Sequence, residues 1–214
     1  MLPPAVTVGS AAVGAAAPWP EETAALPRAV PRRIAEFAAG RAAARDALAG
    51  LGLPPVVLPR GADRLPVWPD GIRGSISHCA TLAIAAATRA DLWPGLDVEP
   101  DAALPADLIP VIATPAEIGA GLTCHAARRL FSAKEAAFKA QFPATRVWLD
   151  FQDLAVTFQP DGSFTARLVR AVGGPAVPGP MPRLPRGHRL AGHWAVRGGL
   201  IVTAVMLPGS GHAG

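Results

Sequence analysis

The sequence predicts an α+β fold built from two similar halves, and three observations lead to this prediction. Each half contains one long stretch of helical sequence, each contains several short strand-like segments, and a Pro-rich stretch separates them. That stretch runs from residue 100 to residue 115 and holds four prolines, so we place the boundary near residue 100. The expected domains are residues 1–100 and residues 101–214.

In the first half, residues 1–30 show little periodicity and contain several prolines, so they are interpreted as an irregular entry segment. A long helix is predicted from about Arg32 to Leu51, where two nearby glycines favour its end. A Pro-rich connection follows. Apolar or alternating sequence then predicts three strands, at 74–78, 82–88 and 93–99.

The second half repeats this pattern in outline. Helical sequence extends from residue 115 to residue 142, with a break expected near Ser132. Residues 172–187 are rich in Pro and Gly, which predicts a mobile surface loop. Four strands are predicted around that loop, at 154–159, 163–169, 193–196 and 200–207.

Composition narrows the class of protein. A chain of 214 residues is long enough to bury a substantial core, and no apolar run reaches the roughly 18 residues that a membrane span needs. Residues 1–18 are apolar, but no Lys or Arg precedes them, which argues against a secretory signal. Cys79 and Cys124 are too few for a disulfide framework, so we expect a reducing, cytoplasmic environment.

The charge balance is modestly basic, with 20 Lys and Arg against 16 Asp and Glu. Nucleic-acid binders concentrate basic residues among aromatic ones, whereas this chain has only two lysines and no tyrosine. We therefore expect neither a nucleic acid nor a membrane as partner. A positive field suits anionic partners, although the solubility of an Arg-rich protein explains the same charge.

Three acidic residues carry the functional interpretation. Asp97 and Glu99 lie two apart in a predicted strand, so they share a face at roughly 6.5 Å separation, where they repel each other unless a cation lies between them. Glu135 lies on a predicted helix four residues before Lys139 and shares its face. Carboxylates without a nearby His or Cys suit Mg²⁺, and an ammonium group suits developing negative charge on phosphate.

Each of these patterns also has an ordinary structural explanation. An Asp-x-Glu pair at a strand end is frequently a solvated edge. Ser132 and Glu135 have the spacing of a helix capping box, and Glu135 with Lys139 is a common pair on a helix surface. Only the combination of the motifs distinguishes a phosphate-transfer site from these alternatives.

In combination, the motifs resemble the 4′-phosphopantetheinyl transferases, and in particular the branch with the enterobactin-synthase type and its actinobacterial relatives. The resemblance extends from about Pro31 to Leu168, and weakly to Leu207. It rests on three segments in order: Gly-Ser-Ile-Ser-His-Cys at 74–79, Gly-Leu-Asp-Val-Glu-Pro at 95–100, and Phe-Ser-Ala-Lys-Glu-Ala-Ala-Phe-Lys-Ala at 131–140. Segments around Glu36, Trp68 and Trp148 agree with it.

The resemblance implies two similar α+β subdomains, related by a pseudo-twofold axis, with the site in the cleft between them. It also implies a role for each matching residue. The metal ligands are Asp97, Glu99 and Glu135, and the metal is Mg²⁺, with Mn²⁺ as an alternative. Glu135 matches the general base, and Lys134 and Lys139 match contacts of the coenzyme A pyrophosphate. The 3′-phosphate and adenosine side of coenzyme A match Arg33, Arg41, Arg60, Ser77 and His78, with Arg45 as a weaker candidate.

Three positions depart from the family pattern. Phe138 stands where the family often has Tyr, and Ala126 and Ala127 stand where it has a Trp-Asp pair. Loss of the Trp could loosen packing under the helix that carries Lys134 and Lys139. None of these positions matches a metal ligand, so we expect an active enzyme.

The resemblance implies that the chain, expected to be a monomer, transfers 4′-phosphopantetheine from coenzyme A to a serine of an apo acyl or peptidyl carrier protein. Carriers of fatty-acid, polyketide, nonribosomal-peptide and siderophore synthesis are all compatible with the sequence. We expect the carrier to dock on residues 109–122. A Mg²⁺-dependent phosphohydrolase or nuclease, and a non-catalytic module that binds coenzyme A, remain as alternatives.

Overall fold

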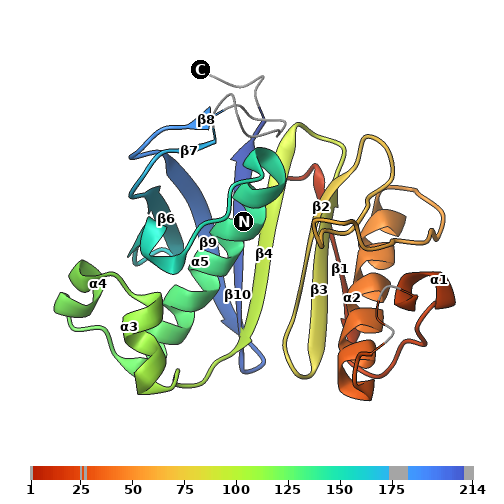
Figure 1. The fold of residues 1–214 in the computed structure, drawn as a ribbon, viewed down its shortest axis with the longest axis horizontal. Coiled ribbons are helices and arrows are strands. Elements are labelled where there is room, and N and C mark those ends of the chain that lie inside the picture. Colours follow the sequence, from red (N-terminus) through yellow and green to blue (C-terminus); the bar gives the residue numbers. More distant parts are fainter. Residues whose placement is uncertain (1, 25, 27, 174–182, 210–214) are drawn as a thin grey trace.

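The computed structural model describes residues 2–24, 26, 28–173 and 183–209. Two antiparallel sheets lie side by side, each with a long helix packed on it (Figure 1). The first sheet has the order β1-β3-β2 and contains β1 (Val6–Ala12), β2 (Arg73–His78) and β3 (Leu82–Thr88). The second has the order β4-β10-β9-β6-β5 and contains β4 (Leu92–Pro100), β5 (Leu154–Phe158), β6 (Ser163–Leu168), β9 (Arg189–Arg197) and β10 (Leu200–Pro208). The structure thus confirms the predicted α+β class.

The two long helices are α2 (Pro31–Gly50), which packs on the first sheet, and α5 (Cys124–Thr145), which packs on the second. Shorter elements connect or extend these layers. They are α1 (Pro20–Thr23), η1 (Ala106–Leu108), α3 (Ile109–Ile112), α4 (Pro115–Gly119), η2 (Phe151–Asp153) and the small β7 (Val172–Gly173) and β8 (Arg183–Leu184) pair. Among the described residues, no helix has the length and apolarity to cross a membrane.

A glycine brings each long helix into direct contact with a strand. A Cβ atom at Gly9 of β1 would overlap the backbone of α2 at Ala43 and Ala47. A Cβ atom at Gly95 of β4 would overlap the backbone of α5 at Ala136 and Ala140 in the same way. In both helices the facing alanines are four apart and fully buried, so small residues on strand and helix allow the close approach.

Most predicted elements are confirmed. The helix predicted from Arg32 is α2, and the strands predicted in both halves correspond to β2, β3, β4, β5, β6, β9 and β10 within a few residues. The loop predicted at 172–187 has β7 and β8 at its two ends. Its central part, residues 174–182, lies outside the described residues.

Three expectations were wrong. Residues 6–12 form β1, although their small side chains gave no strand pattern, because they pair with β3 and pack on α2. The stretch 100–115 contains η1 and α3. Helix α5 continues through Ser132, whose hydroxyl bonds Thr203 of β10, and the break in the helical sequence lies where Thr123 caps α5 instead.

The position of β4 also corrects the boundary near residue 100. This strand pairs with β10 along its whole length, from Leu92 opposite Pro208 to Pro100 opposite Leu200. The division between the two sheets therefore falls between β3 and β4. Asp97 and Glu99 belong to the second sheet, on the same side of the division as α5.

Candidate active site

A cleft of about 550 Å³ lies where the two halves meet. Helix α2 and strand β2 form one wall, and β4 and α5 form the other. Of the residues predicted for the site, the cleft brings together Arg33, Arg41, Arg60, Ser77, His78, Asp97, Glu99, Glu135 and Lys139. Segments more than a hundred residues apart in sequence thus contribute to one surface.

Asp97 is the most enclosed acid of the cleft, with 3% of its surface exposed. Its Oδ1 accepts hydrogen bonds from Lys139 Nζ at 2.6 Å and from Ser77 Oγ at 2.8 Å. Its Oδ2 is buried and has no hydrogen-bond partner in the described part of the chain. A buried carboxylate oxygen without a partner is unfavourable, so Oδ2 is suited to act as a ligand of a cation.

The other two acids line the same cleft in different environments. Glu99 Oε2 accepts a hydrogen bond from Arg128 Nη1 at 2.9 Å, and Glu135 Oε2 lies 4.0 Å from Lys139 Nζ. Burial raises the pKa of both Glu99 and Glu135, and the charge of Asp97 adds to the rise. Crowded carboxylates with raised pKa values favour a bound cation.

In this structure the cation nearest to these carboxylates is the Lys139 ammonium, which lies between Asp97 and Glu135. Within the described residues, no three His, Cys, Asp or Glu side chains are grouped tightly enough to hold a metal ion. The donor set nevertheless fits Mg²⁺, because all three acids line one cleft and Asp97 Oδ2 is unpaired. The metal role of Asp97, Glu99 and Glu135 stays a prediction.

The opposite wall is basic. Arg33 Nη1 lies 2.8 Å from His78 Nε2 and also bonds Glu36. Burial and the nearby Arg33 charge lower the pKa of His78, so the ring is neutral near pH 7 and accepts this bond at Nε2. Arg41 donates to the Leu58 carbonyl, and burial lowers its pKa to about 10, which leaves it protonated. This wall offers cationic groups suited to a phosphate.

Two predicted contacts of coenzyme A have other partners in the structure. Lys134 lies outside the cleft with a fully buried side chain, and its Nζ donates to the carbonyls of Ile112 and Phe151 and to Glu117 Oε2. This arrangement corrects the expectation that Lys134 contacts the pyrophosphate, because its three donors are used to join α5 to α3, α4 and η2. The weaker candidate Arg45 pairs with Glu22 and stacks on Trp19.

Sequence reasoning missed two residues of the site, Glu36 and Arg128. Glu36 bonds Arg33 in the cleft, and Arg128 bonds Glu99. Helical spacing could have indicated Arg128, because it lies seven residues before Glu135 on the same face of α5. The predicted docking segment, 109–122, exposes Val111 and Ile118, and its role stays a prediction.

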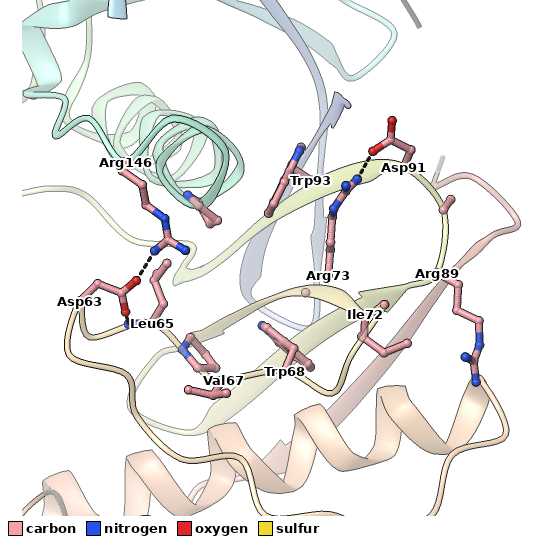
Figure 2. Close-up of a pocket in the computed structure, with 15 residues that line it drawn as sticks. Asp63, Leu65, Val67, Trp68, Ile72, Arg73, Arg89, Asp91, Trp93 and Arg146 are labelled. Atoms are coloured by element: carbon pink, nitrogen blue, oxygen red, sulfur yellow. Dashed lines mark hydrogen bonds and ion pairs between the residues drawn. The ribbon is translucent and has the colours of Figure 1, made fainter. Parts of the chain in front are cut away.

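A second cavity, of about 650 Å³, shares Leu65 and Pro66 with the cleft. Figure 2 shows Trp68, Trp93, Arg73 and Arg146 along it. Arg73 pairs with Asp91 and stacks 4.2 Å from the centre of the Trp93 ring, and Arg146 pairs with Asp63. Both acids of this cavity are thus neutralised by an arginine, whereas the carboxylates of the smaller cleft are crowded. We therefore assign the candidate site to the smaller cleft, where the carboxylates are crowded, and not to the larger cavity.

Comparison with known proteins matches both halves of the chain to one superfamily. The family model described as "4'-phosphopantetheinyl transferase N-terminal domain" matches residues 21–88, and the model described as "4'-phosphopantetheinyl transferase superfamily" matches residues 94–177. The first match ends with β3 and the second begins inside β4, so the change from one model to the other falls close to the division between the sheets.

Similar relatives cover most of the chain. The 4′-phosphopantetheinyl transferase Svp of Streptomyces mobaraensis is 43% identical over 197 residues, which are 87% of this chain and 77% of the relative. The 4′-phosphopantetheinyl transferase PptT of Mycobacterium tuberculosis is 39% identical over 204 residues, 89% of this chain and 86% of the relative. Enterobactin synthase component D of Escherichia coli is 40% identical over 142 residues, 63% of this chain and 68% of the relative. This chain therefore belongs to the 4′-phosphopantetheinyl transferase superfamily.

Proposed function

We propose that this protein transfers the 4′-phosphopantetheine arm of coenzyme A to a serine hydroxyl of an apo acyl or peptidyl carrier protein. One observation supports this function above others: a single cleft joins a basic wall with three carboxylates and a lysine, in a chain of this superfamily. Coenzyme A has a 3′-phosphate that suits the basic wall and a pyrophosphate that suits the wall with the carboxylates and the lysine. The products are the holo carrier protein and adenosine 3′,5′-bisphosphate.

Coenzyme A binding is assigned to the basic wall. Arg33, Arg41, Arg60 and His78 are placed to hold the 3′-phosphate and the adenosine side, because Arg donates two parallel hydrogen bonds to a phosphate and imidazole donates one. His78 and Arg33 are within hydrogen-bond distance of each other, so one phosphate can contact both. Ser77 was expected to contact the same side of coenzyme A. Because its Oγ donates to Asp97 Oδ1, we assign it instead to positioning Asp97.

The chemical step is assigned to β4 and α5. The serine oxygen forms a bond to the β-phosphorus of coenzyme A as the bond to the bridging pyrophosphate oxygen breaks, and Glu135 accepts the serine proton directly or through a water. Lys139 donates to the phosphate oxygens as charge develops on them. Mg²⁺, held by Asp97, Glu99 and Glu135, supplies positive charge against the pyrophosphate when it is bound.

The raised pKa of Glu135 suits a general base. Burial raises the pKa of this carboxyl above its ordinary value. A general base works best when its pKa lies near the pH of the reaction, so a rise from the usual acidic range favours this role. The Lys139 ammonium, 4.0 Å from Glu135 Oε2, opposes that rise in pKa. A cytoplasmic, monomeric enzyme is the form in which we expect this reaction.

Mass spectrometry of a carrier protein tests the proposal. The protein is incubated with coenzyme A, Mg²⁺ and apo carriers from fatty-acid, polyketide and siderophore synthases. We expect at least one carrier to gain the mass of one phosphopantetheine, with release of an equal amount of adenosine 3′,5′-bisphosphate. Nucleotide release without a mass gain would indicate a phosphohydrolase, and binding without release would indicate a non-catalytic module.

A further inference from the structure

Two acid–base pairs connect β4 with the same face of α5. Arg128, Glu135 and Lys139 share that face, because they are separated by seven and four residues. Lys139 at one end bonds Asp97, and Arg128 at the other end bonds Glu99. Glu135 lies between the two cations on the helix. Each strand acid predicted to bind metal therefore has its own cation on α5.

The two pairs differ in how the cation is held. Lys139 lines the cleft, whereas Arg128 is not among the residues that line it. The Arg128 guanidinium donates to Glu99 Oε2 at 2.9 Å and makes longer contacts, of 3.4 Å, with the carbonyls of Ala102 and Ala103. Both side chains of the pair are less than one fifth exposed. A planar guanidinium attached at several points orients the carboxylate that it binds.

Only one oxygen of Glu99 is used in this contact. No described residue donates a hydrogen bond to Oε1, while Glu99 itself lines the cleft. Without Arg128, repulsion from Asp97 on the same strand face would favour rotation of Glu99 away from the cleft. Arg128 opposes that rotation and neutralises one negative charge without occupying the cleft.

We propose that Arg128 is a positioning residue of the transfer reaction, which holds Glu99 by Oε2 so that Oε1 stays available to the cation of the cleft. The inference rests on the proposed function. Groups that orient a metal ligand commonly change metal affinity ten- to a hundredfold when they are replaced. Arg128 also contacts the backbone after β4, so a purely structural role is the competing explanation and the experiment has to separate the two.

Mn²⁺ binding, followed by electron paramagnetic resonance at saturating coenzyme A, separates them. In R128M we expect Mn²⁺ affinity to fall about ten- to a hundredfold while coenzyme A affinity in metal-free buffer is unchanged. R128K keeps the charge but lacks the planar fork, so its affinity should lie between those of R128M and the wild type. If R128M does not fold, R128Q takes its place with the same expectation, because it also removes the charge.

Arg129 provides a matched control on the same helix. It stacks on Phe158 and Trp194, away from the acids, so R129M should lower the unfolding temperature without changing Mn²⁺ affinity. A double variant tests the route of the effect. If Arg128 acts through Glu99, R128M added to E99Q should weaken Mn²⁺ binding much less than it does in the wild type.

The outcomes distinguish this inference from the proposed function. Wild-type affinity in R128M, with or without a lower unfolding temperature, would overturn the positioning role alone. Full additivity of R128M and E99Q would also overturn it. A wild-type protein that binds no Mn²⁺ and modifies no carrier would overturn the proposed function and this inference together.

Discussion

The two halves of the molecule use the same packing but present different chemistry to the cleft. In each half a strand glycine lies directly against two alanines of a long helix, Gly9 against α2 and Gly95 against α5. The cleft side of α2 then offers Arg33 and Arg41, whereas that of α5 offers Glu135 and Lys139. The framework fixes where the helices lie, and a few side chains decide what each half does. We infer that the first half holds coenzyme A and the second performs the transfer.

The largest effect is expected at Asp97. Replacing it with Ala or Asn removes the carboxylate that Lys139 and Ser77 share and the unpaired Oδ2, so carrier modification should fall below detection. The fold should persist, because Lys139, the cation that loses its partner, lines the open cleft and can be hydrated there. Activity titrated against Mg²⁺, with circular dichroism as the folding control, checks this. Wild-type rates at ordinary Mg²⁺ would reject the assignment.

Glu135→Gln separates the base from the ligand. The amide keeps one oxygen for a metal but accepts no proton at neutral pH, so kcat should fall about a hundred- to ten-thousandfold. The dissociation constant of coenzyme A should stay close to that of the wild type. Rapid-quench kinetics and calorimetry measure the two quantities. If binding is lost in step with activity, Glu135 acts mainly as a ligand and the proton leaves by another route.

The 3′-phosphate provides a test of the first half. A charge-assisted hydrogen bond is typically worth about 1.5 to 3 kcal/mol, so dephospho-coenzyme A should bind at least about tenfold more weakly than coenzyme A. In H78A and R33A this difference should shrink, because the contacts that create it are gone. Calorimetry with both ligands decides it. Equal affinities in the wild-type protein would leave the basic wall without its proposed ligand group.

The glycine pair compares the two halves in stability. Gly95→Ala and Gly9→Ala place the same methyl group against equivalent helix backbones, so each should cost about 1 to 3 kcal/mol of unfolding free energy. Their functional effects should differ. G95A moves α5 relative to β4 and should lower kcat, whereas G9A moves α2 and should weaken coenzyme A binding. Urea unfolding and steady-state kinetics report both, and identical kinetic effects would contradict the division between the halves.

The smallest effect concerns stability and pH. The pKa of Glu135 is raised by burial above its ordinary value of 4.5, so between these two pKa values the folded state binds more protons than the unfolded state. Stability contributed by this group therefore falls as the pH rises through that window, and it stays lower above it. In metal-free buffer, E135Q should unfold at a higher temperature than the wild type at neutral pH. The difference should disappear well below pH 4.5. A gap that is independent of pH would contradict the raised pKa.

Much of the site could be predicted from sequence because its motifs carry local signals. The Asp-x-Glu spacing, the four-residue separation of Glu135 and Lys139, and the position of His78 at the end of a strand are visible without a structure. The role of Lys134 was not visible, because the partners that bury it lie in α3, α4 and η2, seventeen or more residues away along the chain. Its neighbour Glu135 lines the cleft as the motif predicts, whereas the position of Lys134 is set by the elements packed against α5.

The fold shows the same distinction between local and distant signals. Helix α2 and strand β3 were predicted from their own residues. Strand β1 was missed because its small side chains become a strand only by pairing with β3, more than seventy residues later. The boundary was placed after β4 because prolines there indicate a linker, whereas β4 joins its sheet through β10, at the other end of the described chain.

One measurement tests the central claim that the two walls of the cleft divide binding from chemistry. It is the comparison of kcat and KM for coenzyme A in H78A and K139A, with the same carrier protein and saturating Mg²⁺. The account predicts that H78A raises KM about tenfold with kcat nearly unchanged, because its contact is the same in substrate and transition state. It predicts that K139A lowers kcat with KM nearly unchanged, because its ammonium matters most as charge develops. A loss of kcat in H78A, or a purely KM effect in K139A, would contradict it.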